Sequence, residues 1–83
     1  MEKSVHSTQY AAVVALLRDA RREAKLTQVE LAERLGITQS LLSKYERGEL
    51  RLDIVQLRAM CQTLDTTLPQ FTAKLEARLK KRS

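Results

Sequence analysis

The sequence predicts a single all-α domain, and three observations lead to this fold class. The 83 residues include only two Gly and one Pro, and good helix formers make up much of the rest. Apolar residues recur at helical spacing along most of the chain. Helix-capping sequences, in which Thr or Asp is followed three residues later by Glu or Gln, begin at Thr27, Asp53 and Thr67. Together these signals predict five helices.

The first predicted helix runs from Tyr10 to near Lys25. Residues 1–8 are polar and lack periodicity, so we expect a flexible N-terminus there, with extension of the first helix into it left open. The apolar positions that follow are spaced for one helix face: Val13, Val14, Leu16, Leu17, Ala20 and Ala24.

Two short helices separated by a glycine turn come next. Thr27 and Glu30 form a capping box, and Gly36 suits the left-handed conformation that ends many helices. Thr38 can cap the third helix, which stops at Gly48. The apolar set of the second helix is Val29, Leu31, Ala32 and Leu35. From the third helix, Leu42 and Tyr45 are expected to face inward.

Capping boxes also open the fourth and fifth helices. Asp53 and Gln56 precede the expected buried stripe of Ile54, Leu57, Met60, Cys61 and Leu64. Thr67 and Gln70 precede a final helix with Leu68, Phe71, Leu75 and Leu79 on one face.

Composition excludes several functional classes. One Cys cannot form an internal disulfide, and His6 with Cys61 cannot complete a zinc site, so neither a metal nor another cofactor is expected. The sequence shows no set of nucleophile, base and orienting residue, so we expect no catalytic residues and no small-molecule substrate. The longest apolar run is far below the ~20 residues of a membrane span, which predicts a cytoplasmic protein without a membrane partner.

The net charge of +5 is unevenly distributed. The segment from Thr67 to Ser83 holds five basic residues and one acidic residue, whereas residues 1–66 hold ten basic and nine acidic residues. Because the body is nearly neutral, bulk charge alone does not indicate a nucleic-acid partner, and the positions of the side chains must decide.

The span from Thr27 to Gly48 is a helix-turn-helix arrangement, in which the second helix lies in the major groove of DNA. The segment LTQVELAERLGITQSLLSKYERG, from Leu26 to Gly48, resembles the Xre-type (lambda-repressor-like) helix-turn-helix family. Two loop positions depart from the family pattern, because Leu52 stands where Pro is common and Asp65 where Gly or Asn is common. The resemblance implies a DNA-binding domain over residues 9–66, with its recognition helix at about 38–47. Residues 67–83 then form a C-terminal helix, with a basic end, that covers the core and supports dimerisation.

Helical geometry places polar residues on the face of the third helix opposite Leu42 and Tyr45. Gln, Ser and Lys are suited to contacts with base edges, and helix N-termini favour phosphate. Two roles remain open for Leu41: it covers a thymine methyl group, or it packs at the edge of the core. The predicted DNA-binding residues are Thr27, Gln28, Thr38, Gln39, Ser40, Leu41, Ser43, Lys44, Arg47 and Arg51.

The resemblance also implies that Arg21 and Glu46 form an ion pair beneath the recognition helix, and that Gln28 clamps the DNA backbone and orients the neighbouring recognition residue. Small regulators of this family usually act as dimers on two half-sites. We therefore predict a homodimeric repressor, bacterial or phage and nucleoid-associated, that binds a palindromic double-stranded operator. Its dimer interface is expected to hold Leu75 and Leu79, with Leu68 and Phe71 shared between this interface and the core of the monomer. The alternative is a protein-interaction module on the same scaffold, such as an antitoxin that binds a toxin.

Overall fold

The computed structural model describes residues 7–82, with side chains as far as residue 80. Five helices follow one another: α1 (Thr8–Glu23), α2 (Gln28–Leu35), α3 (Gln39–Glu46), α4 (Ile54–Thr63) and α5 (Leu68–Arg82). No strand occurs in this range, and the predicted all-α class is confirmed. The predictions for residues 1–6, including His6, and for the side chains of Lys81 and Arg82 lie outside the described residues.

Local side-chain hydrogen bonds begin each helix where the sequence predicts a cap. Thr27 and Asp53 both complete capping boxes, with Glu30 and Gln56 as their partners. Thr38 accepts a hydrogen bond from the backbone N–H of Leu41 at 3.1 Å. These bonds satisfy N–H groups that have no partner inside the helix, and so they fix the first residue of each element.

Left-handed backbone conformations follow the first four helices. Gly36 and Gly48 have φ values of 72° and 75°, the region that glycine adopts without strain. Lys25 and Asp65 occupy the same region after α1 and α4, with φ values of 61° and 63°. Asp65 therefore takes the conformation that the family's more usual Gly or Asn would take at this position.

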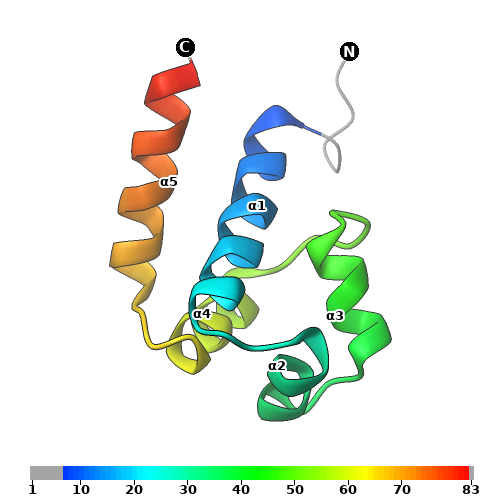
Figure 1. The fold of residues 1–83 in the computed structure, drawn as a ribbon. Coiled ribbons are helices and arrows are strands. Elements are labelled where there is room, and N and C mark those ends of the chain that lie inside the picture. Colours follow the sequence, from blue (N-terminus) through cyan, green and yellow to red (C-terminus); the bar gives the residue numbers. More distant parts are fainter. Residues whose placement is uncertain (1–6, 83) are drawn as a thin grey trace.

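Figure 1 shows α1 between α5 on one side and α3 on the other. Helix α1 packs against both of these helices, α2 packs against α3 and α4, and α4 packs against α5. The core lies where these helices meet, and its members are Leu16, Leu17, Leu31, Ala32, Leu42, Tyr45, Met60, Cys61, Leu64 and Phe71. None of the described helices is long and apolar enough to cross a membrane.

Cys61 lies within this core and is 1% exposed. Burial raises the pKa of its thiol above the usual value, because the apolar surroundings disfavour the thiolate. The expectation that Cys61 packs as a small apolar residue is confirmed.

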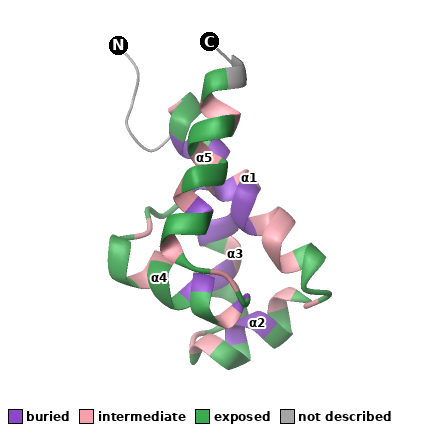
Figure 2. Ribbon diagram, turned by 90° about the vertical axis from the view of Figure 1, so that its left-hand side faces the viewer, coloured by how far each residue is buried: buried purple, intermediate pink, exposed green. Residues whose placement is uncertain are grey.

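One helix boundary lies earlier than the apolar pattern, and one burial prediction was wrong. Ser7 caps α1, and the helix begins at Thr8, two residues before Tyr10. Ile54 was expected to be buried but is 62% exposed. It lies in the first turn of α4, and Val29 in the first turn of α2 is likewise exposed, at 47%. Figure 2 shows the first turn of α4 as an exposed edge of the domain.

Candidate nucleic-acid interface

Helix α3 presents one polar face and one buried face. Leu42 and Tyr45 are buried, whereas Gln39, Ser40 and Lys44 are exposed. The separation follows from the turn angle of about 100° per residue, which carries side chains one and two positions apart to different sides of the helix. The exposed side chains include both hydrogen-bond donors and acceptors, and Lys44 adds a positive charge.

A buried ion pair joins the C-terminal end of α3 to α1. Arg21 Nε lies 2.7 Å from Glu46 Oε2 and Arg21 Nη2 lies 3.0 Å from Glu46 Oε1, so the pair is bidentate. Their side chains are only 11% and 4% exposed. Arg21 also donates to the carbonyl of Leu26, and Arg18 donates to the carbonyl of Glu46 at 2.5 Å. The sequence analysis paired Arg21 with Glu46 but missed Arg18, whose partner is a backbone oxygen distant in sequence.

Gln28 extends this network to the exposed surface. Its side-chain N–H donates to Glu46 Oε1 at 3.0 Å, and its side-chain oxygen accepts from Gln39 Nε2 at 3.4 Å. Glu46, Gln28 and Gln39 thus form a chain from the buried ion pair to the first residue of α3. This arrangement orients Gln39, the side chain that the sequence analysis places at a base edge.

The N-termini of α2 and α3 both begin at capping threonines. Thr27 accepts from the backbone N–H of Glu30 at 3.1 Å, and the Glu30 carboxylate accepts from the backbone N–H of Thr27 at 2.8 Å. This backbone hydrogen bond is the main reason why the pKa of the Glu30 carboxyl lies below its usual value. Thr27 and Thr38 are exposed beside partly positive helix ends, which favour phosphate.

Arg47 is paired within the chain. Its Nε and Nη2 lie 2.8 Å and 3.1 Å from the two carboxylate oxygens of Glu49, and its Nη1 donates to the hydroxyl of Ser43. The structure therefore brings together two of the predicted DNA-binding residues, Ser43 and Arg47, and adds an acidic partner, Glu49, that the sequence analysis missed. The signal for it was an acidic residue two positions after Arg47, directly beyond the glycine that ends α3.

Tyr10 fixes the loop that carries Arg51. Its hydroxyl donates to the carbonyl of Leu50 at 3.2 Å and accepts from the backbone N–H of Leu52 at 2.9 Å. The guanidinium of Arg51 lies 4.4 Å from the centre of the Tyr10 ring, a cation–π contact. Sequence periodicity indicated only that Tyr10 begins the first helix, because these partners lie about 40 positions away.

Leu41 packs at the edge of the core and is partly buried, which favours the second of the two roles considered for it. In α5, Phe71 is 4% exposed within the single chain and belongs to the core. Phe71 therefore has the core role that was one of the two expected of it, and little of its surface is left for a dimer interface. Leu68 and Leu75 also pack against the core, and Leu79 is partly buried.

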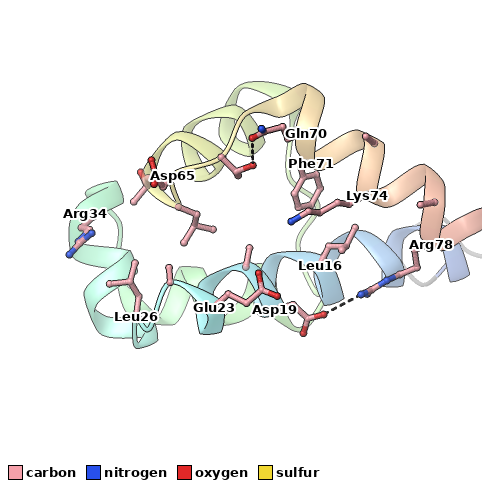
Figure 3. A pocket seen from close by; sticks show the side chains of 17 residues that line it. Leu16, Asp19, Glu23, Leu26, Arg34, Asp65, Gln70, Phe71, Lys74 and Arg78 are labelled. Atoms are coloured by element: carbon pink, nitrogen blue, oxygen red, sulfur yellow. Dashed lines mark hydrogen bonds and ion pairs between the residues drawn. The ribbon is translucent and has the colours of Figure 1, made fainter.

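A groove separates the C-terminal half of α1 from α5, on the side of α1 away from α3 (Figures 1 and 3). Leu16 and Phe71 line it, and an ion pair between Asp19 Oδ2 and Arg78 Nη2, 3.2 Å apart, crosses between the two helices. The groove is thus separated by α1 from the polar face of α3.

Comparison with known proteins agrees with this geometry. A family model described as "Helix-turn-helix" matches residues 17–71. An XRE-family-like protein from Pseudomonas syringae pv. tomato str. DC3000 is 41% identical, with 90% of this chain and 92% of that chain covered and a TM-score of 0.81. No curated protein sequence gives a significant match.

Two further solved structures share the fold. The clp gene regulator ClgR from C. glutamicum is 25% identical, over 86% of this chain and 91% of that chain, with a TM-score of 0.76. The restriction-modification controller protein C.Esp1396I, solved as a tetramer in complex with its natural 35 base-pair operator, is 24% identical. That comparison covers 87% of this chain and 95% of that chain, with a TM-score of 0.79.

The fold and the exposed face of α3 define a helix-turn-helix DNA-binding regulator of transcription, a class of proteins that are not enzymes. Within that class, the chain belongs to the XRE-type helix-turn-helix family.

Proposed function

We propose that this protein is a sequence-specific, homodimeric transcriptional repressor that reads the major groove of a palindromic operator with α3. The observation that carries the proposal is the exposed polar face of α3, where Gln39, Ser40 and Lys44 stand opposite the buried Leu42 and Tyr45. Its bacterial relatives support a bacterial or phage origin and a cytoplasmic, nucleoid-associated location.

Base readout rests mainly on Gln39. A Gln amide can donate to N7 and accept from N6 of the same adenine, which distinguishes that base from the others. The hydrogen bond to Gln28, itself held by Glu46, restricts the side chain before DNA arrives. Such preorganisation reduces the entropy lost on binding. Thr27, Gln28 and Thr38 at the two helix N-termini, with Lys44, Arg47 and Arg51, supply contacts to the phosphates.

Selection of bound duplexes from a random pool tests this function directly. The expected result is an inverted repeat whose half-sites are centred about one DNA turn apart, roughly 34 Å. A pool that shows no enrichment at low salt would contradict sequence-specific binding, and a single enriched half-site would contradict the dimer.

Replacement of Gln39 tests base readout on the selected duplex. We expect Gln39→Ala to weaken binding to that duplex by about 1–3 kcal/mol and to leave binding to an unselected duplex unchanged. The matched control is Gln62→Ala, an exposed Gln on α4. Competition binding with both duplexes separates the two effects, and an equal loss on both would exclude base readout by Gln39.

The dimer requires a surface that lets two α3 helices face the same side of a duplex. An interface made by α5 alone would place the two α3 helices far apart, because α1 lies between α5 and α3 (Figure 1). The most exposed large apolar side chains are instead Ile54 and Val55, at 62% and 73%, in the helix that directly follows the loop after α3. The domain measures 36 × 25 × 21 Å, so two copies in contact can place their α3 helices about one DNA turn apart. We therefore propose that Ile54 and Val55 contact the second copy, with Leu79 as the remaining candidate on α5.

A further inference from the structure

The side-chain contact between Arg47 and Glu49 lies at a turn that backbone hydrogen bonds already hold. Arg47 caps the C-terminus of α3, and its backbone N–H donates to the carbonyl of Ser43 at 3.0 Å. The turn at Gly48 then places Glu49 beside it, with the Glu49 N–H donating to the carbonyl of Lys44 at 2.9 Å. The backbone alone holds this turn, so the side-chain pair is free to serve another purpose.

The geometry of the pair is that of an arginine bound to a phosphate. Two guanidinium nitrogens meet two carboxylate oxygens at 2.8 Å and 3.1 Å, a bidentate arrangement that Arg also forms with two oxygens of a phosphate. The side chains are 53% and 52% exposed, so the pair lies in water on the surface. Exposed pairs of this kind are weak and exchange their partners readily.

The charges around Glu49 keep it ionised. The hydrogen bond from Arg47, and then the positive charges of Arg47 and Lys44, lower the pKa of the Glu49 carboxyl below its usual value. At neutral pH the carboxylate is therefore always present beside two of the cations expected to meet DNA.

We propose that Glu49 is an internal competitor for Arg47 that occupies the guanidinium in place of a DNA phosphate and so lowers sequence-independent DNA binding. This inference rests on the proposed function. Sequence-independent affinity comes almost entirely from phosphate contacts, so the withdrawal of one cation weakens it directly. Contacts from Gln39 and Ser40 to base edges are unaffected, and a larger share of the binding free energy then depends on sequence.

The test is the affinity of Glu49→Gln for a 24-base-pair duplex of arbitrary sequence, titrated from 50 to 300 mM KCl. We expect roughly 3- to 10-fold tighter binding at the lowest salt, with the slope of log affinity against log salt steeper by up to about 0.9 per protomer. The control is Glu76→Gln, which makes the same charge change at an exposed position of α5, far from α3. Arg47→Ala and the double variant Arg47→Ala with Glu49→Gln complete the series.

Each outcome decides between explanations. Tighter binding by Glu49→Gln that disappears in the Arg47→Ala background supports the competitor. Equal gains from Glu49→Gln and Glu76→Gln would show a general effect of net charge and would overturn it. A gain that persists without Arg47 would show simple repulsion between Glu49 and DNA and would also overturn it. If no chain in the series binds any duplex, the proposed function fails and the inference fails with it.

Discussion

Glu46 illustrates how one side chain can serve both the fold and the interface. Its carboxylate accepts from Arg21 and Gln28, and its backbone carbonyl accepts from Arg18. Breaking a buried ion pair leaves the remaining charge without a partner, which is a larger penalty than the pair's net contribution to stability. Glu46 therefore ties α3 to α1 and, through Gln28, controls the position of Gln39.

Replacement of Glu46 should affect stability strongly. We expect Glu46→Ala to lower the free energy of unfolding by about 3 kcal/mol, because Arg21 stays buried without its partner. Urea denaturation followed by circular dichroism measures the change. The control is Glu76→Ala at an exposed site, expected within about 0.5 kcal/mol of the parent. Equal losses of unfolding free energy in the two variants would show that breaking the buried ion pair carries no extra penalty.

At the scale of the elements, the helix ends depend on local chemistry. Gly36 ends α2 at a φ of 72° and sets the angle at which α3 leaves it. An added Cβ at Gly36 would meet no heavy atom within 4 Å, so any effect of a side chain there comes from backbone strain and not from a steric clash.

Because no steric clash is expected at Gly36, substitutions there test the effect of backbone strain on stability. Gly36→Ala should lower the free energy of unfolding by about 1–2 kcal/mol, the usual penalty for an L-residue in the left-handed region. Gly36→Asn should lose less, because Asn tolerates this conformation. Equilibrium unfolding of both variants gives the comparison, and an Asn variant less stable than the Ala variant would refute the explanation.

Capping residues and apolar spacing in the sequence made the helices predictable. The contacts between helices could not be predicted from these local patterns. The caps at Thr27, Thr38 and Asp53 depend on residues within one helical turn, so the sequence is sufficient to place them. Ile54 was misassigned because periodicity identifies a face but not whether another helix covers it. For Phe71, the apolar stripe of the last helix did not show how much of the side chain its own chain covers.

The same distinction holds for the candidate site. The polar face of α3 follows from helical geometry, and Arg21 with Glu46 came from the family resemblance. The bonds of Arg18 to Glu46 and of Tyr10 to the loop span 28 and about 40 positions, and no local pattern marks them. Such contacts become visible only when the helices are packed.

For the whole molecule, the decisive question is which face meets a second copy. Val55 is 73% exposed and lies outside the core, so its replacement by Lys should leave the monomer folded. Leu79 is partly buried on α5, on the other side of α1 from α3.

We expect Val55→Lys to convert the dimer to monomer and Leu79→Lys to leave it dimeric. Sedimentation velocity at several protein concentrations measures the outcome. Val29→Lys, another exposed apolar residue changed to Lys, is the control and should remain dimeric. The reverse result, in which only Leu79→Lys dissociates, would place the interface on α5.

The position of Cys61 has a practical consequence. Its thiolate is the form that alkylating reagents attack, and both burial and a raised pKa suppress that form in the native state. Modification by iodoacetamide therefore has to wait for the helices to separate. The rate of alkylation of this sulfur therefore reports how readily the native protein opens, and mass spectrometry measures it without an added probe.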